Sequence, residues 1–134
     1  MAAAVFRGTA LLLLVCGCTS IAPDARTVEG THWKVTAIDG RPTPGSGDFE
    51  LEFERGRVSG VFGCNRWSAN YAVAGETLKA SEILSTMMAC PGSPMSLEKA
   101  GLAVLGEPMG WTWISGRRLT LTSSAGSIAL ELQR

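Results

Sequence analysis

The chain is poor in the residues that most catalytic and nucleic-acid-binding sites need. Only one of its 134 residues is a histidine, His32, and 12 basic residues balance 12 acidic ones. The largest basic run is Arg117–Arg118, whereas nucleic acid binding requires a basic face. No internal repeat or low-complexity tract is visible. The sequence therefore predicts no nucleic acid partner.

The sequence also lacks an apolar run long enough to span a bilayer. The longest, Ala10–Val15, is far shorter than the roughly 20 residues that a membrane-spanning helix needs. It follows Arg7 and leads into Val15-Cys16-Gly17-Cys18, an arrangement typical of a secretory signal peptide. The end of this segment resembles the bacterial lipobox, in which a small residue precedes the lipidated cysteine. Cys18 fits because Gly17 precedes it, and Cys16 does not because Val15 precedes it.

We therefore expect residues 1–17 to form a lipoprotein signal peptide, with Cys18 as the lipidated N-terminus. The alternative is a plain secretory peptide that is cut nearby. Residues 18–27 are polar and read as a tether, and residues 28–134 form one domain. Several acyl chains on Cys18 would anchor the protein stably. Thr19 replaces the aspartate that retains lipoproteins at the inner membrane, which favours an outer-membrane lipoprotein facing the periplasm.

Alternation with period two dominates the mature chain and is interrupted by glycine-containing turns. Phe49–Glu54 is the clearest case, with three apolar residues alternating with three glutamates, so one face is expected to be buried. In Arg66–Val73 the alternation points Trp67, Ala69, Tyr71 and Val73 inward. About eight antiparallel strands are predicted, which is typical of a sandwich or small barrel. Their ranges are 33–38, 49–54, 57–61, 66–73, 77–80, 111–114, 118–122 and 127–132.

One segment has helical periodicity instead. Ser93 is predicted as its N-cap and Pro94 as its first residue, and Gly106 and Pro108 end it. The apolar face comprises Leu97, Gly101, Val104 and Leu105, with Glu98 and Lys99 expected to face outward.

Few residues could support catalysis or hold a metal. A cysteine nucleophile at Cys64 would need a base, and the chain offers only His32. A metal site needs three or four ligands, and Cys64, Cys90 and His32 would supply three at most, from separate segments. The glutamates at positions 50, 52 and 54 read as a solvated strand face. The sequence predicts no catalytic residue, no metal and no cofactor.

Cys64 and Cys90 are the two remaining thiols once Cys16 is removed and Cys18 is lipidated. Two cysteines in an oxidising compartment most often form a disulfide. Closing a loop between residues 26 apart would stabilise the fold by about 3 kcal/mol. The alternative is that both are small buried apolar residues.

Four motifs in order resemble the META domain, also called the heat-shock protein HslJ-like family, over nearly the whole mature chain. They are a "GTxW" opening, an "SGxxGCNR" turn, a "TxMAC" segment and a terminal pair of strands, and the helix after the "TxMAC" segment carries Glu98. The matching positions are Gly30, Thr31, Trp33, Gly60, Gly63, Cys64, Asn65, Arg66, Thr86, Met88, Ala89 and Cys90. Gly101 departs from the family, which often has a bulky residue there, and this predicts looser helix packing.

The resemblance implies a mainly-β fold, a small lipocalin-like antiparallel barrel of about eight strands with one short helix packed across it. It implies no established catalytic activity. Members are envelope lipoproteins linked to heat shock, to envelope stress responses and to tolerance of certain antibiotics, and relatives in trypanosomatids are linked to virulence and motility. We further expect Arg66 to pair with Glu98 and so tie the "GCNR" corner to the helix.

Together these observations favour a non-enzymatic envelope lipoprotein, a stress-protective or binding module of the periplasm. Its partners would be the membrane, through Cys18, and an unknown envelope protein or small ligand. The candidate working surface is a barrel end or an aromatic patch of Trp67, Trp111 and Trp113, unless these residues belong to the core. The alternatives are a small-ligand carrier of lipocalin type and a cysteine-dependent enzyme.

Overall fold

The computed structural model describes residues 28–45 and 48–134. The predicted signal peptide, the lipidation of Cys18 and the tether lie outside these residues. In the described part of the chain, no helix is long and apolar enough to cross a membrane.

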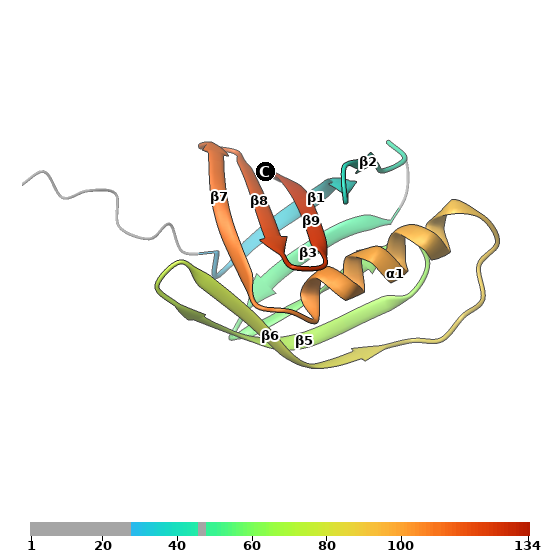
Figure 1. Cartoon of the computed structure of the whole chain (residues 1–134), viewed down its shortest axis with the longest axis horizontal. Coiled ribbons are helices and arrows are strands. Elements are labelled where there is room, and N and C mark those ends of the chain that lie inside the picture. Colours follow the sequence, from blue (N-terminus) through green and yellow to red (C-terminus); the bar gives the residue numbers. More distant parts are fainter. Residues whose placement is uncertain (1–27, 46–47) are drawn as a thin grey trace, which may run out of the picture.

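The described chain forms one antiparallel sheet that closes into an eight-stranded barrel, with one extra strand and one helix (Figure 1). The sheet runs in sequence order and closes where the first strand pairs with the last. Two-residue strand β2 extends the edge of β1. The elements are β1 (Thr31–Ile38), β2 (Arg41–Pro42), β3 (Phe49–Glu54), β4 (Arg57–Phe62), β5 (Arg66–Ala74), β6 (Thr77–Ser85), α1 (Ser93–Leu105), β7 (Met109–Ser115), β8 (Arg118–Ser123) and β9 (Gly126–Leu132).

The mainly-β prediction is confirmed. The fold is a barrel and not a sandwich, because β1 pairs with β9. Strand β2 was not predicted, because two exposed residues carry no alternation. Strand β6 continues to Ser85, beyond the predicted end at residue 80. Its far half meets no strand on its second edge among the described residues, since β6 and β7 share only the pairs Thr77–Gly110 and Leu78–Met109.

The alternation in β3 is the register that the sequence predicted. Phe49, Leu51 and Phe53 are buried, and the three glutamates between and after them are exposed. In β5 the prediction holds for Trp67 and Ala69 but is wrong for Val73, which is 42% exposed. Val73 lies next to the turn at Gly75, where the hairpin extends past the packed interior.

Side chains from every long strand and from the helix fill the barrel as one apolar core. The largest members that are almost completely buried are Trp33, Ile38, Leu51, Phe53, Phe62, Leu78, Leu105, Met109, Leu119, Leu121, Ile128 and Leu130. A small barrel of this strand number is normally filled in this way.

Helix α1 packs closely against the barrel, contrary to the loose packing that Gly101 suggested. A Cβ built at Gly101 would lie 2.4 Å from the ring of Phe62, so the absent side chain is what allows the helix to approach. The N-cap prediction is wrong by one residue: the cap is Gly92, with φ of 84°, and Ser93 begins the helix. Gly106 ends the helix as predicted.

Candidate functional site

The corner between β4 and β5 is fixed by a disulfide between Cys64 and Cys90. The two Cα atoms lie 6.1 Å apart, within the usual range for a disulfide. The predicted bridge is confirmed, and the alternative of two buried thiols is set aside. The bridge ties the corner to residues 86–92, which connect β6 to α1. Because Cys64 is bridged, it carries no thiol that could act as a nucleophile.

Asn65 and Glu98 form a buried hydrogen-bonded pair behind this bridge. The Asn65 backbone N–H donates to Glu98 Oε2 at 2.7 Å, and its side-chain Nδ2 donates to Oε1 at 2.8 Å. Both residues are almost completely buried, with Glu98 6% exposed. A buried carboxylate costs free energy unless its oxygens are hydrogen-bonded, and here one asparagine satisfies both.

The same asparagine holds the connection to the helix. Its Oδ1 accepts hydrogen bonds from Thr86 Oγ1 at 2.9 Å and from the Met88 N–H at 2.7 Å. Its Nδ2 also donates to the Met88 carbonyl at 3.1 Å. We call Cys64, Asn65, Thr86, Cys90 and Glu98 the corner brace. It accounts for five of the motif positions as structural residues.

Two predictions about this corner are wrong. Glu98 faces inward instead of outward, and its partner is Asn65 instead of Arg66. Helical spacing contained the signal, because Glu98 lies three residues before Gly101 and seven before Leu105, on the face that was predicted to be buried. A glutamate is almost never fully buried unless it is paired, and the partner of Glu98 lies 33 residues away.

The "GTxW" motif is structural as well. Gly30, with φ of 74°, turns the chain into β1, and its N–H donates to the Phe53 carbonyl at 2.8 Å. The Trp33 indole N–H donates to Thr31 Oγ1 at 2.7 Å, and the Thr31 hydroxyl bonds the Val28 carbonyl. Gly60 has a steric role, since a Cβ there would lie 2.2 Å from the Glu50 carbonyl oxygen.

The predicted aromatic patch is not a surface feature. Trp67 is 3% exposed and stacks near Phe62, with ring centroids 4.9 Å apart. Trp111 and Trp113 are half-buried against the core. The Trp113 ring lies 5.7 Å from that of Trp33. The core alternative therefore holds for Trp67 and largely for the other two.

Arg66 is the charged motif residue that the corner brace leaves unused. Its backbone pairs with Thr86, but its side chain is exposed, and its guanidinium has no hydrogen bond or ion pair to any described residue. The strand pairs Glu50–Val61 and Val61–Arg66 place these three residues in one row across β3, β4 and β5. Val61 in the middle is only 4% exposed, so it forms an apolar floor between two charged side chains.

Two hollows meet at Arg66 on the outer wall of the barrel. The first, of about 190 Å³, is lined by His32, Glu50, Glu52, Ser59 and Val61, among others. The second, of about 360 Å³, is lined by Ser68, Leu84, Ser85 and Thr86. Arg66 and Trp67 line both. We call the two hollows together the outer trough; it is acidic at one end, basic at Arg66 and apolar at Leu84.

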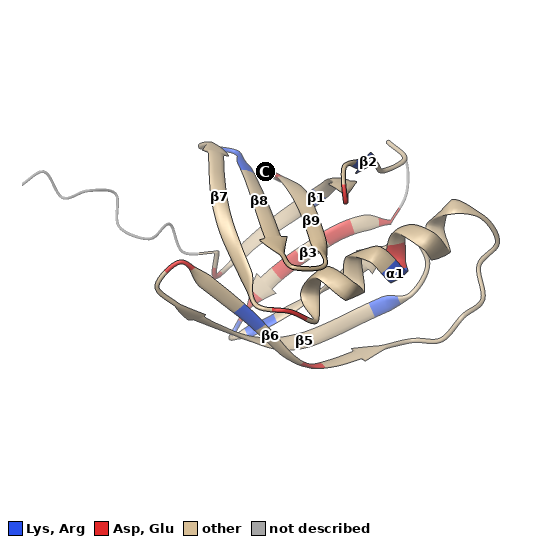
Figure 2. Cartoon of the chain, viewed as in Figure 1, with Lys and Arg blue, Asp and Glu red and all other residues tan. Residues whose placement is uncertain are grey.

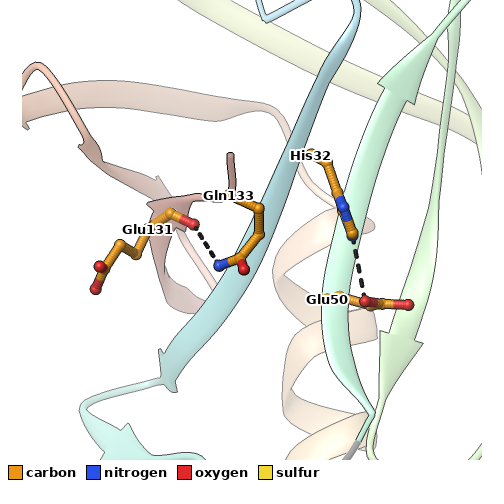
Figure 3. Close-up of polar contacts among 4 residues, drawn as sticks. All are labelled: His32, Glu50, Glu131 and Gln133. Carbon is orange, nitrogen blue, oxygen red and sulfur yellow. Dashed lines mark hydrogen bonds and ion pairs between the residues drawn. The ribbon is translucent and has the colours of Figure 1, made fainter.

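The sole histidine belongs to the acidic end. Its Nε2 lies 3.2 Å from Glu50 Oε2, which joins β1 to β3 across the outer face (Figure 3). Acidic residues are spaced along β3, while basic residues are scattered over several elements (Figure 2). Within the described residues no group of three or more histidine, cysteine or acidic side chains is placed to hold a metal ion. His32 and Cys64 are not brought together: His32 contacts Glu50, and Cys64 bonds Cys90.

A second acidic site, at Glu29, lies beside the turn between β3 and β4 and was not predicted. Glu29 accepts hydrogen bonds from the N–H groups of Arg55 and Gly56 and from the Tyr71 hydroxyl. The Tyr71 hydrogen bond is the main cause that lowers the pKa of Glu29. Burial of the phenol, followed by its contact with Glu29, raises the pKa of Tyr71 to about 12. No sequence spacing links residues 29 and 71, so only the fold reveals this pair.

Comparison with known proteins agrees with this architecture. The chain resembles a solved structure described as an NMR structure of a protein from Burkholderia xenovorans, with 22% sequence identity and a TM-score of 0.65 over 79% of this chain and 83% of the other. A second NMR structure matches with 21% identity and a TM-score of 0.67 over 76% of this chain and 88% of that one. These similarities show the fold alone. No curated protein matches the chain significantly.

The family assignment does not depend on the structural neighbours. The family model described as the META domain matches residues 26–134, which includes all four motifs and every strand of the barrel. The resemblance noted in the sequence is thereby confirmed, and this chain belongs to the META domain family.

Proposed function

We propose that this protein is a non-enzymatic binding module of the bacterial envelope, anchored by a lipid on Cys18 and acting in protection against stress. The observation that supports it is that the motif residues have two roles: most make contacts within the fold, and one is exposed to solvent. The corner brace uses both cysteines and the buried glutamate internally, and Arg66 is left facing solvent in a hollow. An exposed charged side chain held on a braced strand end suits recognition.

The alternatives receive less support. A cysteine-dependent enzyme would need a thiolate at Cys64, and this cysteine is bridged. A lipocalin-type carrier would hold its ligand inside the barrel, but bulky residues such as Trp33, Phe53 and Phe62 occupy the interior. The outer trough is therefore the better candidate for a working surface.

Complementation of a deletion strain under heat or under envelope-directed antibiotics tests the proposal. We expect the wild-type chain to restore survival, whereas Cys18→Ala, which removes the anchor, and Arg66→Gln, which removes the exposed cation, fail to do so. Arg118→Gln is the matched control, because Arg118 is also exposed at a strand start but lies on β8. Full rescue by both Cys18→Ala and Arg66→Gln would contradict the proposal.

A further inference from the structure

The outer trough has three chemically different parts in a fixed order, and the strand register sets that order. One row across the outer face places Glu50, Val61 and Arg66 on successive strands. The neighbouring row places Glu52, Ser59, Ser68 and Leu84 on β3, β4, β5 and β6. Adjacent strands lie about 4.8 Å apart, so the acidic end and Arg66 are separated by roughly 10 Å of backbone.

The charges at the two ends of the first hollow are not satisfied by each other. Neither Glu50 nor Glu52 forms an ion pair with Arg66, and in the described part of the chain Glu50 has His32 as its polar partner. Between them lies the apolar floor of Val61. A ligand that carries an ammonium group at one end and a carboxylate at the other, joined by a short chain, would meet both charges at once.

The second hollow presents an apolar side chain next to Arg66. Leu84 lines it and is 68% exposed, so its side chain is open to an apolar group of a ligand. The corner brace holds this region in place, because the Thr86 N–H donates to the Arg66 carbonyl at 2.9 Å and Thr86 Oγ1 bonds Asn65. A side chain that branches from a ligand beside its carboxylate would reach this apolar part.

We propose that the outer trough binds a short zwitterionic peptide: its carboxylate at Arg66, its ammonium group at Glu50 and Glu52, and an apolar C-terminal side chain against Leu84. This inference rests on the proposed binding role and names the ligand class. An anion alone would meet two carboxylates at the acidic end, and a cation alone would leave Arg66 unpaired. The peptide satisfies both ends, because opposite charges are brought into ion-pair distance at each.

The test uses the dipeptide Gly-Leu, with amide chemical shifts recorded for the chain from residue 18 onward carrying Cys18→Ala. Gly-Leu is expected to shift the amides of His32, Glu50, Ser59, Arg66 and Leu84. Its methyl ester, which lacks the carboxylate, and its N-acetyl form, which lacks the ammonium, should each bind roughly two- to fivefold more weakly, as expected for exposed ion pairs. Gly-Gly, which lacks the apolar side chain, should also bind more weakly.

Variants of the protein test which residues bind the carboxylate and which bind the ammonium group of the ligand. Arg66→Gln should abolish the difference between Gly-Leu and its methyl ester, and Glu50→Gln with Glu52→Gln should abolish the difference from the N-acetyl form. Arg118→Gln should change neither of these two differences in affinity. Unshifted trough amides with Gly-Leu, or an ester difference that survives Arg66→Gln, would overturn the inference. If that happens while Arg66→Gln still fails in the stressed strain, the binding role stands and only the ligand class is wrong.

Discussion

At the scale of single residues, the contacts of buried and half-buried polar groups give the sharpest tests of the structure. Tyr71 is the only tyrosine in the chain, and its ring packs edge-on against Phe53 with centroids 5.0 Å apart. Its hydroxyl bonds Glu29. The ionisation of this phenol therefore reports on its contact with Glu29 at the start of the domain, and no other tyrosine contributes to the signal.

Tyr71 is predicted to titrate about two pH units above an ordinary phenol, because its pKa is raised from 10.0 to about 12. The folded state holds this proton more tightly than the unfolded state. The resulting stabilisation is complete below pH 10 and is lost as the pH rises through about 12. Ultraviolet titration of the phenolate measures the pKa. Glu29→Gln should lower it only partly, since burial is the larger cause; an unperturbed pKa near 10 in the wild type would contradict the contact.

Asn65→Ala is expected to destabilise the fold by about 2–4 kcal/mol, because it strips Glu98 of a side-chain donor and removes the acceptor for Thr86 and Met88. Urea unfolding gives the loss. Asn70→Ala is the control, since its amide bonds exposed side chains only, and it should cost under about 1 kcal/mol. Adding Glu98→Met to Asn65→Ala should recover part of the loss; no recovery would argue against the pair.

At the scale of elements, the alternation in β3 and the corner brace carry the architecture. The three inward residues of β3 belong to the core, and its glutamates Glu50 and Glu52 form the acidic end of the outer trough. One strand thus supplies both stability and a surface, and a shift of register by one residue would exchange the two.

Leu51→Ala is predicted to cost about 2–5 kcal/mol, the range for a fully buried leucine, because Leu51 is only 1% exposed. Denaturant unfolding followed by tryptophan fluorescence measures it. Glu52→Ala on the opposite face should change the free energy of unfolding by less than about 0.5 kcal/mol. Equal losses for the two variants would mean that the register is wrong.

Removal of the Cys64–Cys90 bridge is predicted to lower stability by about 3 kcal/mol, which corresponds to a melting temperature lower by roughly 4–8 °C per kcal/mol in a domain of this size. Calorimetry of the Cys64→Ala/Cys90→Ala double variant measures the change, and the reduced wild type should match it. Mass spectrometry of non-reduced, alkylated protein tests the bridge itself: alkyl groups on both cysteines would contradict it.

At the scale of the whole molecule, a filled barrel leaves only its outer wall and its ends for binding. The interior is occupied by large apolar side chains, and helix α1 packs against Phe62 through Gly101. Attachment to the membrane is a separate property, which depends on residues before the barrel and remains a prediction from the sequence.

Cys18→Ala is predicted to release the protein from the membrane fraction, since the lipid would be its anchor. Fractionation followed by immunodetection measures this. Cys16→Ala is the matched control and should leave the protein membrane-bound, because Val15 before it does not fit the lipobox. Retention of the Cys18→Ala protein in the membrane would count against the lipid anchor.

The sequence by itself determined the class of fold and most strand faces, and it favoured a disulfide between the two cysteines. Alternation with period two is a local property of the chain and survives without tertiary contacts, which is why Phe49, Leu51 and Phe53 were placed correctly. The ordered motifs determined the family. The expected compartment and the lack of any other partner favoured a bridge between Cys64 and Cys90, and the fold decided it by bringing their Cα atoms within 6.1 Å.

Only the tertiary structure decided which polar groups meet. Glu98 pairs with Asn65 across 33 residues and Glu29 with Tyr71 across 42, and such separations carry no periodic signal. Arg66 was assigned an internal partner from its charge alone, whereas the turn at Gly63, with φ of 101°, sends Asn65 inward and Arg66 outward. The outer trough likewise forms where the register of β1, β3, β4, β5 and β6 brings its residues side by side. Register across several strands is a global property that no short stretch of sequence contains.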